Sequence, residues 1–241
     1  VIVLFATIFN PTFVQKIVLT AYSDLSTSVL TGFSMLICYY FLENLAKRQS
    51  GSSWSSTWQL SLVLSLLINI RQANLVLVVA VISAMTILVL RNNGIQIKTY
   101  LKYIIFLCFP IIVVYFAWRY HVATEFQYMP YAEVSIKSFD LWNFLTIPEI
   151  MQSMGYVMFK KIGFFGPMVI ACYFGIRGFL KPKTDFDKIS ILAGSIFLFY
   201  TAFLFFAYIA SFNANSAATA VSFWRYSTHN GMVSVAFIAA G

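Results

Sequence analysis

Long apolar runs separated by short basic loops constrain this chain more than any other feature of its sequence. A transmembrane helix needs about 20 apolar residues, and runs approaching or exceeding that length cover 75–90, 103–118, 162–176 and 189–210. Hydrophobic residues make up 60% of the chain and charged residues 10%, against about 45–50% and about 25% in soluble domains. So few charges cannot cover a water-exposed surface, and we therefore expect an all-α, polytopic transmembrane helix bundle.

The polar residues around Arg71 decide how the predicted spans connect. Residues 58–90 as a single helix would be about 50 Å long, too long for a hydrocarbon core about 30 Å thick. We therefore predict two shorter helices, 58–70 and 75–90, that meet at Arg71. Three loops then share one side, which the positive-inside rule assigns to the cytoplasm. They carry Lys47, Arg48, Arg91, Lys98, Lys102, Arg177, Lys181, Lys183 and Lys188.

The chain begins and ends inside apolar runs, so we expect residues 1–241 to be one transmembrane domain of a longer protein. A Ser-rich loop is expected at 49–57. The longest segment between spans, 119–161, is predicted to be an outer loop. Its second half, 148–159, alternates apolar and polar side chains in the manner of an amphipathic helix lying in the membrane interface.

Missing patterns exclude several chemistries. Cys38, Cys108 and Cys172 are far apart and form no C-x-x-C pair, so neither a disulfide nor a zinc site is indicated. The sequence has no P-loop, no Gly-rich dinucleotide motif and no G-x-S-x-G motif, and no nucleotide cofactor is expected. The net charge of +8 reflects the basic loops, so nucleic acid is not an expected partner. A metal requirement stays open, with a divalent cation as one alternative.

Two polar groups interrupt the first half of the chain on the side opposite the basic loops. Asp24 begins a span, where it serves either as a helix-capping residue or as an acid that binds a cation or polarises a substrate hydroxyl. Arg71 either extends to the interface or binds a phosphate through two hydrogen bonds. Gln72 and Asn74 beside it offer further hydrogen bonds.

Two further groups lie later in the chain. Arg225, Tyr226 and His229 open the last span, and a spacing of four puts Arg225 and His229 on one helix face. They form either an interfacial aromatic and basic belt or part of a substrate site. Asn230 and His229 are deeper than a belt requires. His121 and Glu125, also four residues apart, form a weaker candidate pair in the outer segment.

Several of these motifs, in this order, resemble those of the GT-C glycosyltransferase superfamily, with protein O-mannosyltransferases and bacterial lipid A aminoarabinose transferases as the nearest members. Asn10-Pro11 followed by Tyr22-Ser23-Asp24 is similar to an Asn-Pro pair that leads to Tyr-x-Asp at the start of the next span. Arg71-Gln72-Ala73-Asn74 resembles a Lys-x-x-Gly junction between two short helices, with Arg for Lys and Asn for Gly. Arg225-Tyr226 resembles an Arg-Tyr pair before a late span.

The resemblance implies an enzyme that moves a sugar from a polyprenyl-phosphate-linked donor to a glycan, lipid or protein acceptor at the outer membrane face. It implies a catalytic role for Asp24 near the acceptor or a cation, and contact of Arg71 and Arg225 with the lipid phosphate. Gln72, Tyr226 and His229 are the other expected substrate-binding residues. The principal catalytic acid of such enzymes lies in an outer loop, upstream of Val1.

Two other functions stay open. A transporter or lipid flippase would use Arg71 in a broken helix at its substrate site. A polysaccharide polymerase or ligase would also use outer Arg and His residues on lipid-linked sugars. The expected location is the bacterial inner (plasma) membrane with the active face outward, and the endoplasmic reticulum membrane is the alternative.

Overall fold

A computed structural model of the chain describes residues 23–91, 94–125, 136–180 and 184–241, and this described part contains helices and no strand. Five helical segments are long and apolar enough to cross a membrane. They are α3 (Asp24–Ala46), the segment Gln72–Arg91 that contains α5 (Leu75–Arg91), α6 (Ile97–Glu125), α8 (Ile162–Leu180) and α9 (Asp185–Ala210). The predicted all-α polytopic bundle is confirmed.

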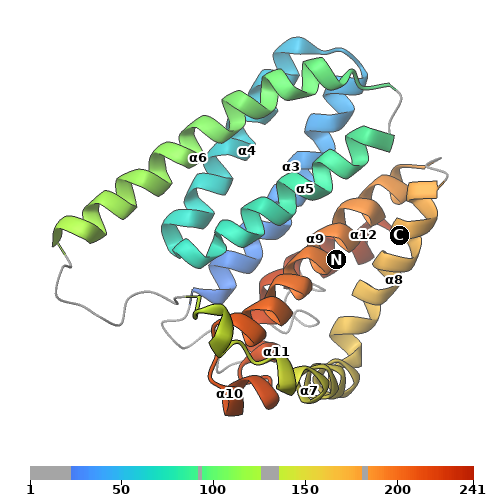
Figure 1. Ribbon diagram of the computed structural model, residues 1–241. Helices are drawn as coiled ribbons and strands as arrows, with labels where there is room; N and C mark the ends of the chain where they lie inside the picture. Colours follow the sequence, from blue (N-terminus) through green and yellow to red (C-terminus); the bar gives the residue numbers. More distant parts are fainter. Residues whose placement is uncertain (1–22, 92–93, 126–135, 181–183) are drawn as a thin grey trace.

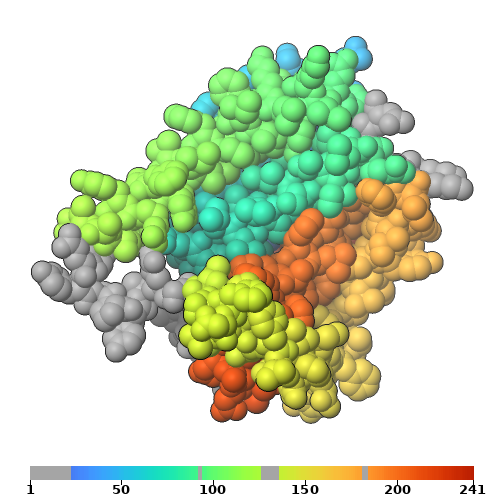
Figure 2. Space-filling model, viewed as in Figure 1, coloured from blue at the N-terminus to red at the C-terminus, as the bar shows by residue number. Residues whose placement is uncertain are grey.

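The long helices run back and forth between two ends of the bundle (Figure 1). The short elements α7 (Ile147–Lys160), α10 (Ala214–Ala218) and α11 (Phe223–Ser227) gather at one of them, which we call the α7 end. At this end α7 contacts α10, α11 and the last part of α9, and its atoms form a layer beside them in Figure 2. Arg225 of α11 is hydrogen-bonded to Asp24 at the start of α3, and Asn74 next to the Arg71 break is hydrogen-bonded to Thr27 of α3, so Asp24 and Arg71 belong to this end as well.

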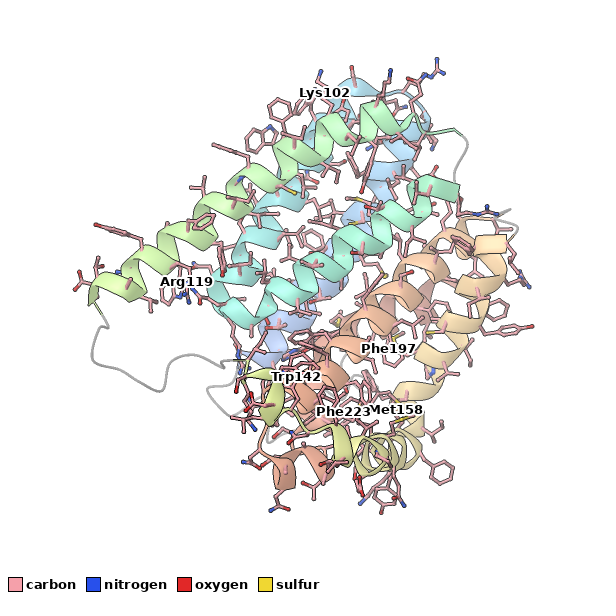
Figure 3. All side chains as sticks on the ribbon, viewed as in Figure 1. Lys102, Arg119, Trp142, Met158, Phe197 and Phe223 are labelled. Carbon is pink, nitrogen blue, oxygen red and sulfur yellow. The ribbon has the colours of Figure 1, made fainter. Side chains whose placement is uncertain are left out.

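The opposite end, which we call the basic end, carries the described residues of the three basic loops. Arg91 at the end of α5 donates hydrogen bonds to the carbonyl oxygens of Phe179 (2.6 Å) and Leu180 (3.1 Å) at the end of α8. Lys188 at the start of α9 forms an ion pair with Glu43 near the end of α3. Figure 3 labels Lys102 at this end, far from Phe223. The prediction that the basic loops lie on one side of the bundle is therefore confirmed for Arg91, Lys102 and Lys188. Lys181 and Lys183 lie outside the described part.

Helix α3 lies at the centre of the bundle and contacts α4 (Ser50–Ile70), α5, α9 and α12 (Gly231–Ala240). Its contact with α12 is close, because a Cβ atom built on Gly32 would lie 2.5 Å from the Cβ of Met232. Small residues also allow α8 and α9 to approach, with Gly175 against the backbone of Ser190. Such contacts are typical of helices that pack in membranes, where small residues permit close van der Waals packing.

The helix break at Arg71 is confirmed, but the helix before it is longer than predicted. Helix α4 covers Ser50–Ile70, so most of the expected Ser-rich loop is helical. Ser53 donates a hydrogen bond to the Gln49 carbonyl (2.8 Å) and Thr57 donates one to the Ser53 carbonyl (2.8 Å). These hydroxyl groups satisfy their polar needs one helical turn back, so their polarity does not end the helix.

The outer segment also begins later than predicted. Helix α6 continues through Glu125, so residues 119–125 of the predicted loop are helical. The amphipathic helix expected at 148–159 is α7, with Ile150 and Met154 buried against the bundle. Its Ser153 hydroxyl donates to the Ala218 carbonyl (2.6 Å) of α10, which fixes α7 against the end of the bundle.

Candidate functional site

A buried carboxylate joins distant parts of the chain at the α7 end. Asp24 is the first residue of α3, and its side chain is 0% exposed. One oxygen, Oδ2, accepts a hydrogen bond from Arg225 Nε at 2.8 Å, and the other, Oδ1, lies 2.8 Å from His229 Nε2. The Tyr200 hydroxyl of α9 is hydrogen-bonded to the other ring nitrogen, His229 Nδ1. We call these four residues the Asp24 cluster.

Capping does not explain Asp24. The N-cap residue of α3 is Ser23, whose side chain makes no capping hydrogen bond. Asp24 follows it inside the first turn, and both of its oxygens face Arg225 and His229 instead of backbone N–H groups. A negative charge at this position also suits the positive end of the α3 dipole. The capping interpretation is therefore wrong, and the carboxylate is instead the centre of a tertiary contact.

The hydrogen bonds of His229 use both ring nitrogens. In the neutral imidazole one nitrogen donates and the other accepts. If Nε2–H donates to Asp24 and Nδ1 accepts from the Tyr200 hydroxyl, both ring nitrogens of His229 have a hydrogen-bond partner. His229 itself is 3% exposed, so the three side chains form a relay closed to bulk solvent, and the ring orientation is set from both sides.

The segment that carries Arg225 and His229 is anchored on each flank. Before it, Phe223 stacks on Phe165 of α8, with ring centroids 5.9 Å apart and an interplanar angle of 9°. After it, the backbone N–H of Met232 in α12 donates to the Ser28 hydroxyl of α3 at 3.0 Å. Ser28 lies one helical turn after Asp24, so the same face of α3 holds both the carboxylate and the start of α12.

The Arg71 junction lies against the same part of α3. Arg71 adopts extended backbone angles (φ −161°, ψ 127°) and ends α4, and the turn η2 (Gln72–Asn74) leads into α5. The amide of Asn74 donates to the Thr27 hydroxyl at 3.1 Å and to the Leu67 carbonyl at 2.9 Å. Thr27 is three residues after Asp24, so this amide ties the junction to the start of α3.

The cluster region carries an excess of positive charge. The charge of Arg71 is close enough to interact electrostatically with Tyr200 and His229. Among the described residues, two guanidinium groups therefore act on the cluster that contains the carboxylate of Asp24. The Arg225 side chain is 29% exposed and Arg71 is half-buried, so both cations are accessible from outside the protein. This arrangement suits an anionic group, because guanidinium binds phosphate through paired hydrogen bonds.

The other predicted site residues divide into two sets. Tyr226 is half-buried, with its ring centroid 6.3 Å from that of His229, and Gln72 follows Arg71 directly, so both belong to this region. His121 and Glu125 are exposed on the last turns of α6, whose end projects away from α11 (Figure 1). The structure does not bring this pair to the Asp24 cluster.

No group of three His, Cys, Asp or Glu side chains suited to hold a metal occurs within the described ranges. Of the residues that carry the resemblance, Asn10, Pro11 and Tyr22 lie outside those ranges. Tyr200 was not predicted as a site residue. It lies in a continuous apolar run, where a tyrosine has no distinguishing signal, and only the packing of α9 against the turn before α12 brings it to His229.

The site is therefore characterised by its geometry: a buried carboxylate, a histidine, a tyrosine and two arginines converge at one end of a helix bundle. Asp24 and Arg225 are 201 residues apart in sequence, and elements from both halves of the chain position them. Comparison of the chain with protein-family models, with curated proteins and with solved structures finds no match.

Proposed function

We propose that the protein is a membrane glycosyltransferase that transfers a sugar from a polyprenyl-phosphate-linked donor to an acceptor at the face of the membrane where the α7 end lies. The observation that carries this proposal is the ion pair of Asp24 with Arg225 at 2.8 Å, with His229 bonded to the same carboxylate and within electrostatic reach of Arg71. A lipid phosphate requires cations near headgroup depth, and these two arginines supply them.

The chemistry follows from competition for Arg225. Both Asp24 oxygens are engaged in the ligand-free protein. A donor phosphate that draws the Arg225 guanidinium toward itself would release Oδ2, which could then accept a proton from an acceptor hydroxyl. The arginines meanwhile stabilise the negative charge that grows on the leaving lipid phosphate.

The surroundings of the cluster suit a lipid-linked substrate. The amphipathic helix α7 lies beside α11 and exposes Met151, Tyr156 and Phe159. Trp142 lies near it, with its ring centroid 5.5 Å from that of Phe206 in α9. Exposed apolar and aromatic side chains of this kind are typical of the membrane interface, where the head of a polyprenyl phosphate resides.

The two alternatives differ in how they use the same residues. Transporter substrate sites lie near the middle of the membrane, whereas the Asp24 cluster lies at one end of the bundle, which favours an enzyme acting at the interface. A polysaccharide polymerase or ligase would use the same cations on a lipid-linked sugar. The acceptor distinguishes that class, because a polymerase extends a growing glycan chain.

Binding of polyprenyl phosphate to the full-length protein in nanodiscs tests the proposal. We expect Arg71→Lys and Arg225→Lys to weaken binding by about tenfold each, because lysine cannot form the paired guanidinium contact. Arg91→Lys at the basic end is the matched control and should leave the affinity unchanged. Unchanged affinity in both site variants would reject the phosphate site, and lipid transport without sugar transfer would support the flippase alternative.

A further inference from the structure

One buried side chain next to the Asp24 cluster has no hydrogen-bond partner. Asn230 is 1% exposed, and neither its amide nitrogen nor its amide oxygen is hydrogen-bonded to any residue that the structure describes. Buried polar groups in folded proteins are almost always hydrogen-bonded, so each exception needs an explanation, of which an absent ligand or water is one. Asn230 follows His229 directly and begins α12, without capping that helix through its side chain.

The two other buried asparagines in the described part of the chain have bonded amide nitrogens. The amide of Asn143 donates to the carbonyls of Tyr208 (2.9 Å) and Phe212 (2.7 Å). Asn74 donates to Thr27 and to Leu67, as described above. The fold therefore bonds the amide nitrogens of these two asparagines, and it leaves both polar atoms of Asn230 without a partner among the described residues.

A second unpartnered amide lies in the other segment that borders the cluster. The Nε2 atom of Gln72 is buried and lacks a hydrogen-bond partner. Gln72 follows Arg71 as Asn230 follows His229. The segment that carries Arg225 and His229 thus contains one unused amide, and the Arg71 junction contains an unused amide nitrogen.

We infer that Asn230, together with Gln72, binds the uncharged, hydroxyl-bearing part of the ligand, namely the sugar ring of the lipid-linked donor. This inference rests on the proposed function, in which Arg71 and Arg225 bind the phosphate. A carboxamide offers donors and an acceptor side by side, which matches two neighbouring hydroxyl groups of a sugar. Sites built to hydrogen-bond a hydroxyl strongly reject ligands that lack it, because their buried polar atoms then stay unpaired.

The ligand-free protein provides the first test. We expect Asn230→Leu, of similar size, to raise the thermal unfolding midpoint, because it removes two buried polar atoms that bond to nothing. Asn143→Leu is the matched control and should lower the midpoint, since it leaves the bonded carbonyls without donors. Asn230→Ala tests the same point without adding volume. If both Asn230 variants lower the midpoint as much as the corresponding Asn143 variants, the amide is structural and the inference is wrong.

Ligand binding provides the second test, with the full-length protein and two probes: bare polyprenyl phosphate, and polyprenyl phosphate carrying glucose or mannose. We expect one of the sugars to bind the wild type at least tenfold more tightly than the bare lipid, and Asn230→Leu to lose this increment while it still binds the bare lipid. A retained increment overturns the role of Asn230. An absent increment in the wild type overturns the inference but leaves the phosphate site standing. Failure of all probes to bind the wild type rejects the proposed function and this inference together.

Discussion

Asp24 connects the other charged and titratable residues of the cluster, because its two carboxylate oxygens are hydrogen-bonded to Arg225 and His229. Asn preserves the shape of Asp but removes the charge, so Asp24→Asn leaves a guanidinium without its anion. Breaking a fully buried ion pair costs about 3–5 kcal/mol, and the partial exposure of Arg225 reduces this to roughly 2–3 kcal/mol. We expect a corresponding loss of stability in thermal unfolding and loss of sugar transfer.

Asp140→Asn is the control for this change, because Asp140 is an exposed acid at the same end of the bundle. It should unfold and transfer like the wild type. Full transfer by Asp24→Asn would remove Asp24 from the mechanism, and unchanged stability would mean that Arg225 finds another partner or water when the charge is gone.

Tyr200 acts one step further from the substrate, through the ring of His229. Tyr200→Phe removes a single hydroxyl and leaves a buried ring nitrogen without a partner, which costs about 1–3 kcal/mol. Tyr208→Phe is a close match, because Tyr208 lies on the same helix, is also buried, and donates to the Val221 carbonyl at 2.8 Å. We expect both variants to lose stability and only Tyr200→Phe to lose transfer and to alter the imidazole resonances of His229. Equal transfer by the two variants would make the Tyr200 hydroxyl purely structural.

At the scale of the elements, the close contact of α3 with α12 determines where His229 stands. A methyl group at Gly32 would meet the Cβ and backbone carbon of Met232 at 2.5 and 2.9 Å, so Gly32→Ala must push the two helices apart. Overpacking of this kind costs about 1–3 kcal/mol. We expect lower thermal stability together with weaker sugar transfer, because the displaced α12 moves His229 away from Asp24.

Gly51 supplies the opposite case for the same substitution. It lies in α4 at the basic end with no atom within 4 Å of a Cβ built on it. Gly51→Ala should therefore raise stability by roughly 0.5–1 kcal/mol, because alanine favours the helix. A neutral Gly32→Ala beside a stabilising Gly51→Ala would show that α12 moves without cost.

The positions of the membrane-spanning helices could be predicted from the sequence, whereas some of their ends could not. Span positions follow from apolar runs, because a membrane admits little else than helices of sufficient length. The ends of α4 and α6 could not be predicted, since hydroxyl groups in α4 bond within the chain and Ser61 bonds the Leu107 carbonyl of α6 at 2.8 Å. The Ser61 bond depends on tertiary packing, and the bonds one helical turn back allow polar residues to continue a helix without marking where it begins.

The candidate site divides in the same way. Asp24, Arg225 and His229 could be identified because polar residues in apolar surroundings are uncommon. Their mutual bonding could not, because Asp24 is more than 200 positions away from both partners. Tyr200 could not be identified at all, since its role arises only where α9 meets the turn before α12.

For the whole molecule, the separation of charge between the two ends predicts its orientation. The basic end carries Arg91, Lys102 and Lys188, so the positive-inside rule assigns it to the cytoplasm and the α7 end to the outer face. We expect a membrane-impermeant maleimide applied to intact cells to label Asn215→Cys, an exposed position in α10, and to miss Ser52→Cys, an exposed position near the start of α4. Ser52→Cys should react only after the membrane is permeabilised.

The wild-type protein is the control for labelling of the native cysteines. We expect it to react little, because Cys38 is buried and Cys108 and Cys172 are half-buried. The reverse labelling pattern would show that the Asp24 cluster faces the cytoplasm. A donor presented at the outer face would then be out of reach of Arg71 and Arg225, and transfer at that face would be rejected even if the phosphate-binding test succeeded. Orientation and phosphate binding therefore test the proposed function independently, one through the charge of the whole molecule and the other through two of its side chains.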